Sequence, residues 1–465
     1  MRTIQWAAFF AMGSVILNAC SISEQSKAKE LDQYLSSLID QKQAVGIAVA
    51  VNQDGNWVWS NTYGFAELEN NQHVTDSTRF HIMSITKQFV AVAVMQLVEK
   101  GLVNTPSPIS TYIENLPKKY DSVYVYQLLN HSSGIPDYVE DPGFLKKSKL
   151  QKNPEEVIAS MLTKPFLFRP GEKNEYSNTN YYLLGMLIER VAKIKLEDYL
   201  MKDIFIPADM RNTYLEGASK TNRSIAIGYT SSGTKWNEKS DVDPTQYWAA
   251  GGVVTTLRDM MKWNDALMSE KLVSASSLKQ MITPVNLTNG IPAEYGFGFE
   301  LMTLPHTKIA GHNGAGLGFN CSYMNFLDDK ISVIVLTNSS NSNSTLIAKN
   351  IDDRLNNRKN SNEAVQSAKP LDKLDSLATQ LMRAVSDKST VDANHFLNED
   401  VKEEFEEAVL DMIDDHGSFV SLTKQAEKIN PETFVRRYTL KFKNSETGCI
   451  VIFSKEGKVA VINRK

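Results

Sequence analysis

Apolar and polar residues alternate with different periods along the first hundred residues, and these periods predict a helix, a strand hairpin and a second helix. After Lys27, leucine and isoleucine recur at helical spacing, which predicts an amphipathic helix. Residues 45–51 and 57–65 are typical strand sequences, and the Asp-Gly pair at 54–55 is a strong signal for a hairpin turn. Residues 84–102 are mostly apolar, with a continuous apolar run at 89–95, which predicts a largely buried helix.

Strand character returns only at residue 295, after a middle that mixes helix and loop signals as far as residue 267. Four alternating runs precede one more helix: residues 295–301, 308–313, 319–326 and 331–336, with the helix at 344–355. The simplest packing joins the early hairpin and the late strands in one antiparallel sheet. We therefore expect an α/β (α+β) fold, in which helices flank this sheet and an all-helical region covers one face.

The C-terminal part of the chain has a pattern of its own. Residues 356–369 are rich in Asn, Lys and Ser and lack apolar rhythm, so they are interpreted as a linker after a first domain at 20–355. Residues 370–465 are expected to form a small α+β accessory domain. A length of about a hundred residues is common for a domain with its own core. Its predicted helices lie near 374–381 and 405–412, and its predicted strands at 434–442, 449–453 and 459–462.

The N-terminus reads as a targeting segment. Arg2 precedes an apolar run at 4–17 that is too short to span a bilayer, and the run ends shortly before Cys20. The segment resembles a bacterial lipoprotein signal, which implies a signal peptide at 1–19 and a lipid anchor on Cys20. The alternative is an ordinary secretory signal. Ser21 gives no inner-membrane retention signal, so we expect a cell-envelope protein anchored in the outer membrane and facing the periplasm.

Composition excludes several classes of function. The 465 residues are 42% hydrophobic and 22% charged, and their net charge of −4 argues against nucleic acid as a partner. The seven histidines form neither His-Glu-x-x-His nor His-x-His, so we expect no metal and no cofactor. Besides Cys20 only Cys321 and Cys449 occur, and both are interpreted as buried thiols rather than a disulfide framework.

Five Ser-x-x-Lys pairs occur, and one of them stands out. They begin at Ser26, Ser84, Ser232, Ser276 and Ser421. Only Ser84 has apolar flanks and opens a predicted buried helix, on which Lys87 shares its face. A buried lysine is costly unless it has work or partners, and desolvation, helped by a nearby cation, lowers its pKa towards that of a base. Ser84 is therefore the candidate nucleophile and Lys87 its activator.

Two further motifs follow in order along the chain. Tyr176 and Asn178 lie in a loop before a predicted helix. A phenol near an ammonium group ionises more easily, so Tyr176 is a candidate proton carrier, whereas the Asn178 amide can hold Lys87 or a substrate carbonyl. The stretch at 311–315 contains His312, Asn313 and Gly314, which we expect to bind substrate along a strand edge.

The amide of Ala315, at the end of the same strand, is expected to form an oxyanion hole with the amide of Ser84. Gly316 and Gly318, which follow on the same segment, are interpreted as a turn between strands rather than as a phosphate-binding loop.

These ordered motifs resemble the serine β-lactamase and D-alanyl-D-alanine peptidase superfamily, and specifically its class C branch with the related esterases. The segments at 128–136, 176–181 and 250–252 also match that branch, and the resemblance covers roughly residues 30–350. It implies the sheet-and-helix fold inferred above. It also implies a serine hydrolase that forms a covalent acyl-enzyme on Ser84.

One position departs from the pattern of the β-lactamases in this branch, which usually carry Lys-Thr-Gly where this chain has His312-Asn313-Gly314. An imidazole with a pKa near ~6.5 is mostly neutral at pH 7 and attracts a substrate carboxylate weakly. This leaves a D-amino-acid peptide, a β-lactam-like compound or a small ester, including peptidoglycan-derived molecules, as substrates. An α/β-hydrolase is excluded because Gly-x-Ser-x-Gly is absent. The remaining alternative is a binding or sensor lipoprotein that is acylated without turnover.

Overall fold

The chain forms two compact units, Met1–Asn356 (unit 1) and Asn357–Lys465 (unit 2). A computed structural model describes residues 25–141, 153–216, 225–232, 235–238, 243, 246–358, 373–387, 399–416, 418–429, 433–442, 446–454 and 459–464. The division falls at Asn356, where the expected linker begins. The signal segment and Cys20 lie outside the described residues. Among the helices that are described, none is long and apolar enough to cross a membrane.

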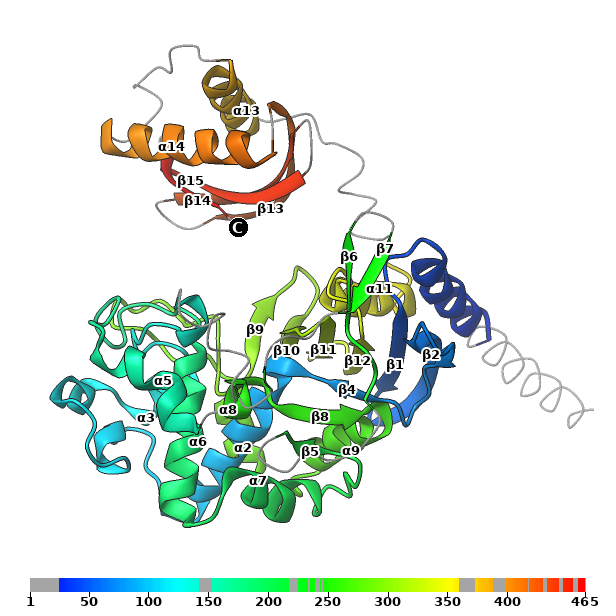
Figure 1. Cartoon of the computed structure of the whole chain (residues 1–465), viewed down its shortest axis with the longest axis vertical. Coiled ribbons are helices and arrows are strands. Elements are labelled where there is room, and N and C mark those ends of the chain that lie inside the picture. Colours follow the sequence, from blue (N-terminus) through cyan, green and yellow to red (C-terminus); the bar gives the residue numbers. More distant parts are fainter. Residues whose placement is uncertain are drawn as a thin grey trace, which may run out of the picture. The chain divides into compact units, whose positions relative to one another are not determined.

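Unit 1 is built on one seven-stranded antiparallel sheet, as the sequence predicted (Figure 1). In spatial order its strands are β3 (Gln72–His73), β2 (Asn56–Glu67), β1 (Gly46–Gln53), β12 (Ile331–Thr337), β11 (Phe319–Phe326), β10 (Lys308–Gly316) and β9 (Glu300–Thr303). Strand β1 pairs with β12 and so joins the early hairpin to the late strands. Asp54 and Gly55 both have positive φ, the conformation of a tight hairpin turn.

The two faces of this sheet have different cores. On β1, Ile47, Val49 and Val51 pack against leucines of a helix at 25–40 and against α11 (Ser344–Leu355). The alternate residues Ala48 and Ala50 belong to the core under the helical middle. Their small side chains allow α9 (Leu257–Met268) to contact β1 and β12 closely. The period of two in the sequence therefore places one helical layer on each face.

The helical middle surrounds the buried helix α2 (Thr86–Glu99), which contacts α6 (Asn178–Ala192) and α8 (Trp248–Gly251). Its other helices are α3 (Val125–Leu129), α5 (Pro154–Thr163), α7 (Leu196–Tyr199) and α10 (Ala275–Met281), with the short helices η2 (Ile109–Thr111), η3 (Lys118–Ser122), η4 (Tyr138–Glu140) and η5 (Leu200–Phe205). A small sheet, β4 (Arg79–His81), β8 (Val253–Thr256) and β5 (Tyr214–Leu215), and a hairpin, β6 (Tyr229–Ser232) and β7 (Lys235–Glu238), complete unit 1.

Two predicted elements of unit 1 differ from the structure. The strand expected at 295–301 is only β9, from Glu300 to Thr303. The chain before it turns over α2: Gly298 has φ +81°, and a Cβ there would lie 2.7 Å from the Ala91 Cβ. Periodicity does not detect such a close approach. The buried helix begins at Thr86 instead of Ser84, because a short 3-10 turn precedes it.

Unit 2 pairs two helices with a four-stranded antiparallel sheet. Its helices are α13 (Lys373–Ser386) and α14 (Glu399–His416), and its strands in order are β13 (Phe419–Ile429), β14 (Thr433–Phe442), β15 (Glu446–Ser454) and β16 (Val459–Arg464). The core contains Leu381, Met382, Phe405 and Met412 among others. The sequence predicted all of these elements except β13. That strand mixes Lys, Gln and Glu with few apolar residues and has no clear period of two.

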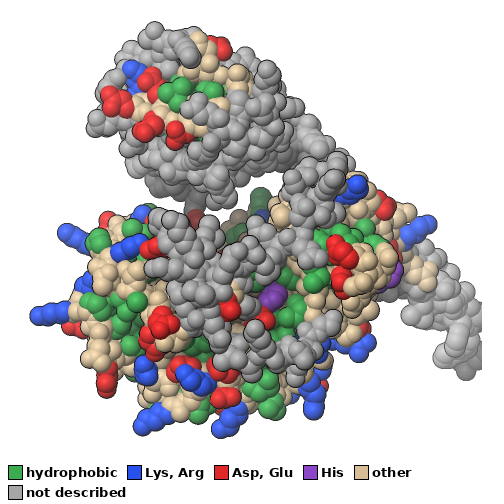
Figure 2. Space-filling view, in the orientation of Figure 1, with side chains coloured by type: hydrophobic (Ala, Val, Ile, Leu, Met, Phe, Trp, Pro, Cys, Tyr) green, Lys and Arg blue, Asp and Glu red, His purple; other side chains and the backbone are tan. Residues whose placement is uncertain are grey.

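Charged side chains of both signs lie together on the visible face of unit 1 (Figure 2). This agrees with the small net charge of −4. The buried cysteine Cys321 lies in β11, as predicted, whereas the side chain of Cys449 lies outside the described residues. Tyr323, Met324 and Asn325 on the same strand repeat the spacing of Tyr176 and Asn178, but all three are buried, so they belong to the core.

Candidate active site

Ser84 lies on η1 (Met83–Ile85), the short turn directly before α2. Its neighbours Ile82, Met83 and Ile85 are buried, whereas Ser84 is partly exposed. Met83 has φ +48°, an uncommon conformation for a residue with a side chain. Buried apolar neighbours hold the turn in this conformation, which is how functional sites often store local strain. The apolar flanks that distinguished Ser84 in the sequence therefore anchor the turn that presents its hydroxyl.

Lys87 is completely buried on the first turn of α2. Its Nζ lies 3.1 Å from Ser84 Oγ, 2.8 Å from Asn178 Oδ1 and 2.7 Å from the Ala250 carbonyl oxygen. The amide and carbonyl oxygens can only accept, so they fix the directions of two N–H bonds. The third position on the nitrogen faces Ser84. It holds a proton in the ammonium form and a lone pair in the amine form, and the lone pair can take the Ser84 proton.

Burial determines the protonation of Lys87. It lowers the pKa of the amine to about 7, while the carboxylates of Asp137 and Glu300 act in the opposite direction. Free amine is therefore abundant near neutral pH, as a general base requires. Desolvation of Lys87 was predicted, but the expected neighbouring cation is wrong. The charged neighbours are carboxylates, which keep the pKa from falling further.

Tyr176 donates a hydrogen bond from its hydroxyl to Ser84 Oγ over 2.8 Å. Lys87 Nζ lies 4.7 Å from the centre of the Tyr176 ring. The expected lowering of the phenol pKa is wrong. Although Tyr176 is 39% exposed, desolvation around its hydroxyl and the carboxylates of Glu300 and Asp137 raise this pKa. Tyr176 therefore remains a neutral phenol, which suits it to pass a proton through its hydroxyl rather than to act as a phenolate base.

Asn178, the first residue of α6, links Lys87 to a carboxylate. Its Oδ1 accepts from Lys87, and its Nδ2 donates to Asp137 Oδ2 over 2.8 Å. The Asp137 bond fixes which end of the amide faces the lysine. The sequence reading missed Asp137, although it directly follows the segment 128–136 that supported the family resemblance. It also missed the Ala250 carbonyl, which belongs to the matching segment 250–252.

Strand β10 runs directly beside the Ser84 turn. A Cβ on Gly314 would lie 2.0 Å from the Ile82 carbonyl oxygen and 3.0 Å from Ser84 N, so only glycine fits. Asn313 and Ala315 are exposed on this strand, while Gly311, His312 and Gly314 are buried. The amides of Ser84 and Ala315 remain the predicted oxyanion hole. The strand thus brings the predicted substrate-binding residues to the nucleophile.

His312 is 1% exposed and has a partner at each ring nitrogen. Nε2 lies 2.7 Å from the Tyr295 hydroxyl, and Nδ1 contacts the Asn313 carbonyl oxygen. Because a carbonyl only accepts, the proton is assigned to Nδ1, and Nε2 accepts from Tyr295. Burial and Lys87 lower the pKa of His312 to about 3. The imidazole therefore stays neutral even at pH values well below ~6.5, the ordinary histidine pKa that was assumed from the sequence.

Glu300 is a second carboxylate that the sequence reading did not identify. It lies opposite Gly311 in the pairing of β9 with β10, and its Oε1 is 3.7 Å from His312 Nδ1. Burial raises the pKa of Glu300 to about 7, although a hydrogen bond from the Asn313 amide acts to lower it. No motif marked this residue. Only its place on the strand beside β10 brings it to the site.

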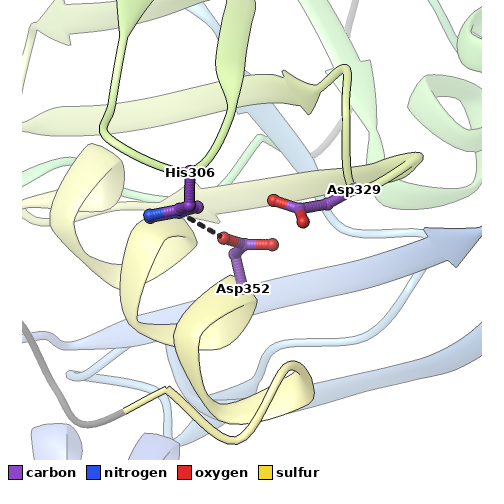
Figure 3. Close-up of side chains that lie close together, drawn as sticks. All are labelled: His306, Asp329 and Asp352. Carbon is purple, nitrogen blue, oxygen red and sulfur yellow. Dashed lines mark ion pairs between the residues drawn. The ribbon is translucent and has the colours of Figure 1, made fainter.

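Among the described residues, one group has the donor types of a metal site: His306, Asp329 and Asp352 (Figure 3). All three donor atoms lie within 4.8 Å of one another. His306 Nε2 already pairs with Asp352 Oδ2 at 3.5 Å, and Asn356 donates to the other oxygen of Asp352. This pairing accounts for the contact between the β9–β10 connection and α11. The group shares no residue with the Ser84 site.

Comparison with known proteins matches residues 31–357 to the Beta-lactamase family. A penicillin-binding protein of Bacillus subtilis is 27% identical over 335 residues, which cover 68% of this chain and 72% of that protein. A D-aminopeptidase of Cereibacter sphaeroides is 27% identical over 320 residues, which cover 66% of this chain and 59% of the relative. The chain thus spans less than two thirds of the D-aminopeptidase.

Solved structures share the fold. A D-amino acid amidase from Ochrobactrum anthropi SV3 has a TM-score of 0.60 at 24% identity and covers 72% of this chain and 99% of its own. The octameric penicillin-binding protein homologue from Pyrococcus abyssi has a TM-score of 0.63 at 22% identity. That match covers 93% of this chain and 94% of its own, so it extends beyond unit 1.

Proposed function

The chain belongs to the Beta-lactamase family, and from that premise we propose that it is a serine hydrolase that cleaves an amide or ester through an acyl-enzyme on Ser84. The observation that carries the proposal is the convergence of two groups on one oxygen. Lys87 Nζ and the Tyr176 hydroxyl lie 3.1 and 2.8 Å from Ser84 Oγ. One group is a base near neutral pH, and the other is a phenol that stays protonated.

In acylation, the Lys87 amine takes the Ser84 proton while Oγ attacks the substrate carbonyl carbon. The Ser84 and Ala315 amides stabilise the negative oxygen that develops. When the carbonyl re-forms, the bond to the leaving nitrogen or oxygen breaks. Tyr176 gives its proton to that leaving atom and receives the proton that Lys87 holds, so no phenolate accumulates.

Deacylation repeats these transfers with water. The amine of Lys87 takes a proton from water, through the Tyr176 hydroxyl, as the water oxygen attacks the ester carbon. Ser84 leaves as the alkoxide and is reprotonated by Lys87. The acid product departs, and both side chains return to their starting protonation states.

The substrates proposed here are D-amino-acid peptides, β-lactam-like compounds and small esters, and the first class fits the similarity to a D-aminopeptidase. Efficient β-lactam hydrolysis is the least favoured of these. The β-lactamases of the class C branch usually carry a lysine at this position, whereas this chain has His312, which burial keeps neutral. The class C type of hydrolase is likewise a proposal and rests on the motifs from Ser84 to Gly314.

We also propose export. The apolar segment before Cys20 supports a lipoprotein signal, a lipid anchor on Cys20 and an outer-membrane location facing the periplasm. Peptidoglycan-derived substrates would be available there. Replacing Cys20 with serine should abolish incorporation of labelled palmitate. Unchanged membrane fractionation without palmitate in the unaltered protein would instead indicate an ordinary secretory signal.

The test of the nucleophile is labelling of purified protein with a fluorophosphonate, followed by peptide mapping. We expect one adduct, on Ser84, and none in Ser84→Ala. The exposed Ser276, which also lies three residues before a lysine, provides the control: Ser276→Ala should label normally. Labelling that persists in Ser84→Ala overturns the assignment. A stable acyl adduct without product release would favour the sensor alternative.

A further inference from the structure

Among the described residues, Glu300 is an acidic side chain at the Ser84 site that takes no part in the proton transfers of the proposed reaction. Asp137, the other carboxylate, holds Asn178 and through it Lys87. Glu300 instead lies on β9 and accepts from the Asn313 amide of β10. Its side chain is 26% exposed, so a bound molecule can reach it. The negative electrostatic potential of a carboxylate in this position acts on any substrate that binds along β10.

The side chains around Glu300 leave its charge largely unbalanced. Among the described residues, its only basic neighbour at ion-pair distance is His312, which burial keeps neutral. Lys87 and Lys349 act on Glu300 only at longer range. His131, which packs beneath Tyr176, is also kept neutral by burial. When Glu300 is ionised, this side of the site is therefore negative.

The neighbours of Glu300 also indicate which half of the substrate it meets. Its charge raises the pKa of Tyr176 and of Tyr295. The Tyr176 and His312 rings are 6.2 Å apart, and Tyr295 contacts both. Glu300 is 3.7 Å from His312, whose ring is 6.2 Å from that of Tyr176, so Glu300 lies near the group that protonates the leaving atom in the proposed reaction. A charge on the leaving group would come closest to Glu300.

We propose that Glu300 selects substrates by the charge of their leaving group, favouring a cationic or neutral group and rejecting one that carries a carboxylate. The substrate class is then an amide or ester whose alcohol, thiol or amine half bears an ammonium group and has no nearby carboxylate. This inference rests on the proposed function, because it needs the acyl-enzyme on Ser84. It adds a specificity residue that makes no contact with the scissile bond.

The test uses three acetyl thioesters whose leaving groups share a two-carbon stem and differ in the charged or neutral group at its end: acetylthiocholine, S-acetyl-2-mercaptoethanol and S-acetyl-3-mercaptopropionate. Because the end groups also differ in size and in thiol acidity, the effect is read from the change between the unaltered protein and each variant. Thiol release is followed at about pH 8, above the usual carboxyl pKa and the shifted one. We expect kcat/KM to fall in the order cationic, neutral, anionic. Glu300→Gln should reduce the cationic-to-anionic ratio about tenfold, and Glu300→Lys should invert the order, the scale expected for one close charge.

The matched control is Glu294→Gln, the same change at an exposed position six residues earlier, which should leave the ratio unchanged. A purely structural role for Glu300 would lower kcat/KM for all three thioesters equally and leave the ratio as it was. That result overturns the inference while Ser84-dependent hydrolysis stands. Absence of Ser84-dependent turnover for every thioester, with no acyl adduct, would instead count against the proposed function.

Discussion

The two sides of Ser84 organise charge differently. On the helical side, Lys87, Asn178 and Asp137 form a chain in which each polar group has a fixed partner. On the strand side, His312 is neutral, and the carboxylate of Glu300 has no cationic side chain at ion-pair distance among the described residues. In the function proposed above, the helical side moves protons and the strand side discriminates between substrates. Variants on the two sides should have different signatures.

The largest effect is expected from Lys87→Met on the helical side. The substitution keeps the volume and removes the base, so kcat/KM should fall by roughly 10³-fold to 10⁴-fold for every substrate. Steady-state kinetics with the neutral thioester measure it. Lys279→Met, at the exposed lysine of another Ser-x-x-Lys pair, is the control and should be silent. A loss of less than tenfold would show that another group deprotonates Ser84.

Asp137→Asn should have the next largest effect. Either the oxygen or the nitrogen of the new side-chain amide at position 137 can face Asn178, so the orientation of the Asn178 side chain is no longer fixed. As a result, kcat/KM should fall by about one order of magnitude. The fall should be the same for cationic, neutral and anionic leaving groups. The exposed Asp121→Asn serves as the control. A changed preference among leaving groups would break the division between the two sides.

His312→Lys tests the strand side. A lysine there places a cation beside Glu300, so the ratio of kcat/KM for the anionic thioester to that for the neutral one should rise by about tenfold. The neutral thioester itself should change little. An equal change in both would mean that His312 takes part in the chemical step. The variant must first give a circular dichroism spectrum like that of the unaltered protein, because His312 is buried.

The smallest effect is expected from removing unit 2. Its described residues form a core of their own, and every residue assigned to the Ser84 site lies in unit 1. A chain ending at Asn356 should keep kcat/KM for small thioesters within about twofold, since separate domains usually fold independently. Circular dichroism establishes that the shortened chain is folded. Loss of activity in a folded chain would show that unit 2 supports the reaction.

The sequence predicted the sheet, the two helical layers and the nucleophile because each leaves a periodic or local signal. Ile47, Val49 and Val51 alternate with alanines, and the apolar flanks of Ser84 precede a continuous buried helix. Family membership confirms the resemblance that these motifs supported. The residues of the proposed catalytic group were thus marked by three motifs, and their roles stay a prediction.

The charges around those motifs were not visible. Asp137 and Glu300 are brought to the site from distant parts of the chain, and neither has a spacing that marks it. Without them, the pKa of Tyr176 was expected to fall, and the structure raises it. The burial that makes His312 neutral likewise depends on packing by Tyr295 and β9. Electrostatics depends on three-dimensional neighbours, so periodicity cannot supply it.

If the free amine of Lys87 activates Ser84, the rate of acylation must depend on the protonation of Lys87 and therefore on pH. Stopped-flow measurement of the first turnover with the neutral thioester isolates this step. Because only the amine form accepts the Ser84 proton, the acylation rate should rise with pH around 7, the pKa of Lys87. The pKa of Glu300 is also raised to about 7, so the rise should persist in Glu300→Gln, at a lower midpoint because the Glu300 carboxylate raises the pKa of Lys87. The carboxylate of Asp137 raises that pKa, so Asp137→Asn should move the midpoint to lower pH. An amine of this pKa must titrate between about pH 5 and pH 9, so an acylation rate that stays constant over this range would show that Lys87 does not deprotonate Ser84.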